Sequence, residues 1–171
     1  GTSWTTVTHL DNKVTAIAIS NADSRIVLVG TKTNGLVRPE DGGENWVNYE
    51  KTLKDYKASD RVYGFAQNAD GSVAIMNTQY GLLVSKDKGT TWTGVSLISS
   101  SGEVEIQSLA VAPDNGDLIY YGTSNTLNRS TSGGSAWTTT ELPTSRAAGA
   151  LLIDPNDSSH IYLGSKVIDK D

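Results

Sequence analysis

The feature that most constrains the fold of this 171-residue chain is a polar eight-residue motif that ends in tryptophan and returns at nearly equal intervals. Its most complete copy spans 85–92 (SKDKGTTW), and related copies span 39–46 (PEDGGENW) and 130–137 (STSGGSAW). The chain opens on the tail of another copy, 1–4 (GTSW). The tryptophans therefore follow each other at intervals of 42, 46 and 45 residues, at Trp4, Trp46, Trp92 and Trp137. A fixed period of this length predicts a repeat architecture.

A second marker has the same phase. Apolar, strand-like segments recur at 14–19, 62–66, 106–111 and 148–153, and their central residues are 48, 44 and 42 residues apart (Ile17, Phe65, Leu109 and Leu151). Each segment is followed by a turn rich in Asn, Asp, Pro and Gly, then by a second short strand, a third that leads into the motif, and a fourth that leaves from its tryptophan. Four antiparallel strands in each period of about 45 residues predict an all-β fold, a β-propeller built of four-stranded blades.

We therefore expect one domain, 1–171, which is a β-propeller or a segment of one, with about four blade-equivalents. Residues 1–10 are expected to form the last strand of a blade, 14–51, 61–97 and 105–141 complete blades, and 148–171 a partial blade; 52–60 is expected to be a long loop. Three arrangements of the ends stay open: a small ring that closes by using 1–10 to complete its last blade, two chains that pair their open ends, or part of a larger propeller. Open blade edges predict self-association.

Composition excludes several classes of function. The sequence has no cysteine, which removes disulfides, thiolate chemistry and cysteine-based zinc sites. The net charge of −5 is spread along the chain without a long run of Lys or Arg, which argues against nucleic acid as a partner. No stretch approaches the roughly 18 apolar residues of a membrane-inserted helix. The chain begins at Gly1 without a Met or a signal-like segment, so we expect a mature or excised piece. The absence of cysteine is compatible with an oxidising compartment, and we expect a location outside the cell, on its surface or in a periplasm.

The pattern Ser-x-Asp-x-Gly-x-Thr-Trp resembles the Asp box, or BNR repeat, of sialidase-like, sortilin-like and YCF48-like β-propellers. The second copy matches at every position: Ser85, Asp87, Gly89, Thr91 and Trp92. The first copy keeps Asp41, Gly43 and Trp46, the third keeps Ser130, Gly134 and Trp137, and Trp4 ends the partial copy.

In the families that it resembles, this motif lies on the face opposite the active site, so the resemblance implies a structural role. An Asp at the third position can accept hydrogen bonds from amides of its own loop, the Gly permits positive φ, and the Trp can cover the blade edge with apolar area. A calcium ion would need six to eight oxygen ligands, whereas this loop offers one carboxylate. We therefore expect no metal and no cofactor.

Catalysis is not supported by the residues present. Sialidase-like enzymes use three arginines, a Tyr–Glu nucleophile and an acid/base Asp, whereas only Arg61 and Arg146 stand just before first strands here. Xyloglucanase-type glycoside hydrolases need two large propellers, which this chain is too short to supply. His9 and His160 make no metal-binding spacing. We expect no catalytic residue, and the alternative is that the chain is a fragment of a glycoside hydrolase of sialidase or xyloglucanase type.

Binding is the function that the pattern favours. In a propeller, the loops between blades (8–13, 52–61, 97–105 and 142–147) and those between second and third strands (32–34, 77–80 and 124–126) gather on one face, where a rigid frame presents them. The candidate ligand-binding residues on these loops are Tyr56, Asp60, Arg61, Tyr80, Glu103 and Arg146. The sequence thus predicts a non-catalytic binding or scaffold module that presents one propeller face to a protein or a glycan.

Overall fold

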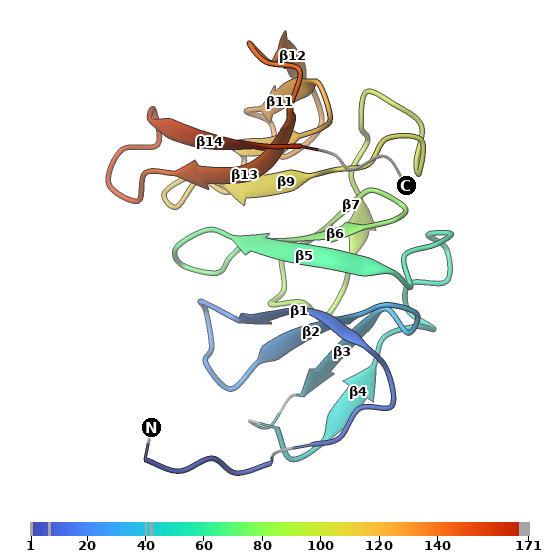
Figure 1. Cartoon of the computed structure of the whole chain (residues 1–171). Helices are drawn as coiled ribbons and strands as arrows, with labels where there is room; N and C mark the ends of the chain where they lie inside the picture. Colours follow the sequence, from blue (N-terminus) through green and yellow to red (C-terminus); the bar gives the residue numbers. More distant parts are fainter. Residues whose placement is uncertain (1, 7, 40, 42, 168–171) are drawn as a thin grey trace.

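A computed structural model describes residues 2–6, 8–39, 41 and 43–167 of the chain (Figure 1). Within these ranges the protein is all-β, with fourteen strands in three four-stranded antiparallel sheets and one two-stranded sheet. The first sheet holds β1 (Val14–Ile19), β2 (Val27–Thr31), β3 (Leu36–Pro39) and β4 (Trp46–Asn48); the second holds β5 (Val62–Gln67), β6 (Ala74–Thr78), β7 (Leu82–Ser85) and β8 (Thr93–Gly94). The third holds β9 (Ser108–Val111), β10 (Ile119–Gly122), β11 (Thr126–Ser130) and β12 (Thr138–Glu141), and the last holds β13 (Ala147–Ile153) and β14 (Ile161–Lys166).

In each sheet the strands lie side by side in chain order and pair antiparallel. The first strands are neighbours in space, because β1 packs beside β5, β5 beside β9, and β9 beside β13. The four sheets therefore stack as an arc, with the first sheet and the two-stranded sheet at opposite ends (Figure 1). This is the blade arrangement of a β-propeller, and it confirms the predicted fold class.

The hydrophobic core lies between the sheets rather than within one. One buried cluster joins the first and second sheets, another the second and third, and a third joins the third sheet to β13 and β14. The alternation of a strand explains this, because successive side chains point to opposite faces. On β5, Phe65 packs toward the first sheet, and the next residue, Ala66, packs toward the third.

A β-bulge marks the start of three first strands. The pairing register shifts between Val14 and Ala16 on β1, between Val62 and Gly64 on β5, and between Ala148 and Ala150 on β13. In each case one extra residue sits between the two paired ones. The three sheets therefore receive the chain from the preceding loop in the same way.

The ends of the chain differ from the expectation. Residues 2–6 and 8–10 were expected to form the last strand of a blade, but they form no strand, and Trp4 is 96 % exposed. A strand needs a neighbouring strand for its backbone hydrogen bonds, and Figure 1 shows the N-terminal segment beside the first sheet, far from β13 and β14. Closure of one chain on itself is therefore not seen. The expected end of the partial blade, 168–171, lies outside the described residues.

Candidate functional site

The inter-sheet loops and the loops between second and third strands form one continuous face, as expected. The loop 97–105 shares hollows with Gln79 on one side and with Asn125 on the other. Backbone hydrogen bonds link the other loops to their neighbours. At the first and second sheets, the amide of Lys32 donates to the Lys13 carbonyl (2.9 Å), that of Gly35 to the Asp60 carbonyl (2.7 Å) and that of Gln79 to the Arg61 carbonyl (3.0 Å). At the third and last sheets, the amide of Leu142 donates to the Asn125 carbonyl (2.9 Å) and that of Ala148 to the Thr123 carbonyl (3.0 Å). We call this surface the loop face.

The turns between first and second strands line the opposite side. Asn21 Nδ2 donates to the Asn68 carbonyl (2.8 Å), and the Ala69 amide donates to the Pro113 carbonyl (2.8 Å), so these turns also bond from sheet to sheet. The third copy of the eight-residue motif belongs to this side, because the amide of Gly133 donates to the carbonyl of Asp117 (3.0 Å) in one of these turns. The motif and the loop face thus lie on opposite sides of the arc.

The complete motif copy is a closed hydrogen-bond network centred on Asp87. Its carboxylate accepts from the amides of Thr90 (3.1 Å) and Thr91 (2.8 Å), from Thr91 Oγ1 (2.6 Å) and from Ser85 Oγ (2.8 Å). Ser85 Oγ in turn accepts from the Gly89 amide (2.8 Å), and Trp92 Nε1 donates to the Gly89 carbonyl (3.1 Å). The side chains of this loop therefore bind the loop itself.

The two imperfect copies make the same central bond with different residues. Asp41 accepts from the Asn45 amide (2.8 Å) in the first copy, and Ser132 Oγ accepts from the Ala136 amide (2.9 Å) in the third. In all three copies the third position bonds the amide four residues on. Trp92 packs in the core between the first and second sheets, and Trp137 packs against the cluster between the second and third. Their ring N–H groups differ: Trp92 Nε1 donates within its own loop, whereas Trp137 Nε1 donates to the carbonyl of Ser96 (2.8 Å), just after β8.

The electrostatics of Asp87 agree with this role. Partial burial raises the pKa of its carboxyl, but the hydrogen bonds from Thr91, Ser85 and Thr90 outweigh burial and hold the pKa below its ordinary value. The hydrogen bonds from Asn45 likewise lower the pKa of Asp41. Both carboxylates are held ionised with their acceptor positions occupied, which suits a structural joint and not a proton carrier.

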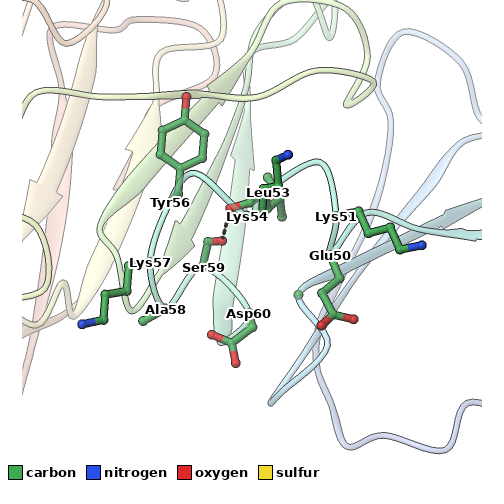
Figure 2. A pocket seen from close by; sticks show the side chains of 10 residues that line it. Glu50, Lys51, Leu53, Lys54, Tyr56, Lys57, Ala58, Ser59 and Asp60 are labelled. Atoms are coloured by element: carbon green, nitrogen blue, oxygen red, sulfur yellow. Dashed lines mark hydrogen bonds between the residues drawn. The ribbon is translucent and has the colours of Figure 1, made fainter.

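One hollow of the loop face lies along the loop between β4 and β5. It has a volume of about 290 Å³ and is lined by Gly35, Glu50, Lys51, Leu53, Lys54, Tyr56, Lys57, Ala58, Ser59 and Asp60 (Figure 2). We call it the 50–60 pocket. Its loop has no helix and winds through successive turns, as expected, with the amides of Tyr56 and Ser59 donating three residues back. Ala58 takes a left-handed conformation with φ 68°.

The pocket is anchored to the frame of the protein at two points. Leu53 is buried in the core between the first two sheets, and its carbonyl accepts a hydrogen bond from Ser59 Oγ (3.1 Å). The Gly35 amide donates to the Asp60 carbonyl. Figure 2 shows the carboxylates of Glu50 and Asp60 on one side of the loop and the phenol of Tyr56 on the other.

The structure brings two of the expected binding residues together, in a packing role. The rings of Tyr56 and Tyr80 meet edge to face, with centroids 5.2 Å apart and an interplanar angle of 66°. Both rings are half-buried against the core, and Gly94 gives them room, since a Cβ there would lie 2.9 Å from Tyr56 Cε1. The edge-to-face contact and the core therefore engage part of each ring.

The other expected residues are spread along the loop face. Asp60 lines the 50–60 pocket, whereas Arg61 is not among its lining residues and makes no ion pair with Asp60 in the described part of the chain. Glu103 Oε2 accepts from the Ser100 amide (3.3 Å) within its own loop, and Arg146 is exposed in the loop before β13. The structure shows no single cleft that contains all six.

Sequence reasoning missed part of the pocket. Glu50 and Lys51 were counted with the first blade, but they line the pocket beside Lys54 and Lys57. The signal that could have found them is the recurrence of lysine every third residue at 51, 54 and 57, which matches a loop built of successive three-residue turns.

Among the described residues, no three His, Asp or Glu side chains are grouped so that they could hold a metal ion. No helix long and apolar enough to cross a bilayer occurs in the part of the chain that the structure describes.

Comparison with protein-family models finds no match, and comparison with curated protein sequences finds none. Solved structures do match. An ancestral GH74 enzyme gives a TM-score of 0.68 at 18% identity over 90% of this chain, and the extracellular domain of the one-component system BT4673 from B. thetaiotaomicron gives 0.69 at 17% identity over 92%. YCF48 from Cyanidioschyzon merolae gives 0.62 at 18% identity over 75%.

The chain spans 22% of the GH74 structure, 20% of the BT4673 structure and 40% of the YCF48 structure. At these identities the likeness establishes the fold alone. It supports a β-propeller repeat and shows that solved propellers of this kind extend over several times the length of this chain.

Proposed function

We propose that the chain is a non-catalytic binding or scaffold module of the Asp-box, or BNR, type, which presents its loop face to a protein or a glycan outside the cell, at its surface or in a periplasm. The observation that carries the proposal is the 50–60 pocket, a hollow with charges of both signs on a rigid frame. The motif geometry supports the Asp-box assignment, because the third position bonds the amide four residues on in all three described copies. The extracellular location of the BT4673 domain supports the compartment.

The pocket is arranged to receive a ligand with little reordering. Leu53 and Gly35 tie the loop to the first sheet, so the loop need not lose much conformational freedom on binding. Lys51, Lys54 and Lys57 are exposed on one stretch, and the carboxylates of Glu50 and Asp60 lie beside them. A ligand that carries both hydrogen-bond donors and acceptors meets partners of each kind here.

The same geometry favours a polypeptide over a neutral glycan as the ligand. Sugar rings bind well on the free face of an aromatic side chain, and the two tyrosines of this region pack against each other and the core. The groups offered to a ligand are ammonium and carboxylate groups, which pair with charged side chains of a protein.

The pocket supports binding rather than catalysis. Among the described residues, the carboxylates of Glu50 and Asp60 form no hydrogen bond with a second side chain that could serve as nucleophile or base. An activated nucleophile or a general acid–base pair needs such a neighbour. Both carboxylates are instead available to donors of a bound partner.

The test is a parallel screen of the purified chain on a peptide array of charged sequences and on a glycan array, followed by titration of each binder. We expect peptide binding that weakens at high salt and falls at least tenfold in Lys54→Glu/Lys57→Glu. The matched control is Lys86→Glu, an exposed lysine in the motif on the opposite side. Binding unchanged by the pocket variant contradicts the site. Hydrolysis of a sialoside or a β-glucan by the chain contradicts the non-catalytic assignment and favours the glycoside hydrolase alternative.

A further inference from the structure

The three junctions between sheets are built at the same register position. At each junction a residue at the start of a first strand points at the second strand of the preceding sheet. Val62 and Ala148 lie just before the bulges of β5 and β13, and Ile106 lies at the matching position, two residues before Ser108 of β9. We call these three residues knobs. The facing residues, which we call sockets, are Gly30, Asn77 and Gly122. A Cβ on Gly30 would lie 2.5 Å from Val62 Cγ1, and one on Gly122 would collide with the Ala148 Cβ. At the middle junction Asn77 Nδ2 donates to the Ile106 carbonyl (3.1 Å).

One knob and one socket are left without a partner within the described chain. Val14 holds the knob position on β1 and is 47 % exposed, whereas Val62 and Ala148 are 0 % exposed. Gly164 holds the socket position on β14, and a Cβ there would meet only the Ala150 Cβ, at 3.4 Å. The unfilled pair, Val14 and Gly164, has the same residue types as the filled pair of the first junction, Val62 and Gly30.

The apolar residues around the free knob and the free socket are exposed to solvent, whereas the residues at the same register positions in the other sheets are covered by a neighbouring sheet. Ile17 and Ile19 on β1 are exposed, while the equivalents of Ile17 on later sheets, Phe65, Leu109 and Leu151, pack on the preceding sheet. On the last sheet, Leu152 and Tyr162 face each other in register and are 63 % and 60 % exposed. The second-strand equivalents of Tyr162 are buried under the next sheet; they are Leu28, Ile75 and Tyr120.

We propose that a second copy of this chain docks head to tail on the first. The knob face (Val14, Ile17 and Ile19 on β1) of one copy packs on the socket face (Leu152, Tyr162 and Gly164 on β13 and β14) of the other, with Val14 over Gly164. The two faces are the two halves of a junction that the chain already builds three times, and they lie at opposite ends of the arc (Figure 1). Because a knob fits a socket and not another knob, the contact is heterologous, and two copies form the smallest closed ring.

The heterologous contact makes a complementation experiment possible. Light scattering after size exclusion and sedimentation velocity are measured on the wild type, on a knob variant (Val14→Lys/Ile17→Lys) and on a socket variant (Leu152→Lys/Tyr162→Lys). We expect association of the wild type at micromolar concentration and monomers for each variant alone. An equimolar mixture of the two variants should form a dimer of one of each, since each keeps the face that the other has lost.

Ile98→Lys is the matched control, because Ile98 is an exposed apolar residue on the loop face, away from both ends. It should associate as the wild type does. All changed positions on the two faces are exposed, so circular dichroism and the melting temperature of the monomers should confirm folding. Gly164→Leu, which fills the socket without adding charge, should also abolish association. The proposal is overturned if the wild type stays monomeric, if the single variants associate like the wild type, or if the mixture remains monomeric. Either of the last two outcomes would point to contacts between like faces or to another occupant.

Discussion

Replacing Asp87 by Ser and by Ala tests whether the motif is a joint of the fold. The Asp87 carboxylate accepts four hydrogen bonds within its loop, and Ala removes all of them. The loop is exposed, so water replaces part of the loss, and about 0.5 kcal/mol for each bond gives a destabilisation of about 2 kcal/mol. Ser132, at the same motif position in the third copy, shows which of these hydrogen bonds a serine can still make. Its Oγ accepts from the amide four residues on (2.9 Å) and lies 3.4 Å from the Oγ of Ser130. Asp87→Ser should therefore cost roughly half as much.

The assay is thermal unfolding followed by circular dichroism, with binding to the loop face as a second readout. For a domain of this size about 2–4 °C of melting temperature corresponds to 1 kcal/mol, so Asp87→Ala should melt roughly 4–8 °C lower, with Asp87→Ser in between. Ser132→Asp is the reciprocal control and should raise the melting temperature. The reasoning fails if Asp87→Ala melts like the wild type, or if it loses binding while its stability is unchanged.

The pH dependence of the same series has a definite sign. Hydrogen bonding lowers the pKa of Asp87 in the folded state below its value in the unfolded chain. The stability that this carboxylate contributes is therefore fully present above the unfolded pKa of about 4 and is lost as the pH falls through the folded pKa. The gap in melting temperature between wild type and Asp87→Ser should be constant near neutrality and should shrink in acid. A gap that widens in acid would contradict the assignment.

Four further changes give distinct signatures in urea or thermal unfolding. Trp92→Ala should cost about 3–5 kcal/mol because Trp92 is buried between two sheets, whereas Trp4→Ala, at a fully exposed position, should leave stability unchanged. Lys88 has φ 61° where the third copy has Gly133 at φ 63°, so Lys88→Gly should stabilise by about 0.5–1 kcal/mol. Gly122→Val would fill the space of a knob and should destabilise by about 1–3 kcal/mol, and a neutral result would contradict the close approach of the third and last sheets.

Sequence pattern predicted the fold because its signals are local. The bounds of β1, Val14–Ile19, were predicted to the residue, since turn-forming residues flank an apolar segment at both ends. The 50–60 pocket could not be predicted in the same way, because it depends on a backbone path. The Gly35 amide meets the Asp60 carbonyl, and Ala58 turns the loop with positive φ at a residue that gives no such signal in sequence.

The role of the tryptophans shows the same limit. Their spacing set the phase of the repeat correctly, but it suggested that each covers the edge of its own blade. Trp92 instead packs between its sheet and the preceding one, and Trp4 is exposed. The contacts of each tryptophan depend on the neighbouring repeat. The sequence of the eight-residue motif alone therefore does not determine them.

The separation of the two sides of the arc gives the proposed assembly a functional consequence. Every described sheet presents its inter-sheet loop to the same side, because the knob-and-socket junction holds successive first strands in one orientation. A second copy that docks through the same junction must therefore present its own loops to that side as well. The two 50–60 pockets would then lie on one common face, fixed relative to each other by packed sheets and not by a linker. A partner with repeated charged segments could engage both pockets at once, so its second contact would form at a high effective concentration. On this reasoning the end faces determine how strongly the loop face binds, although neither Val14 nor Gly164 touches the ligand.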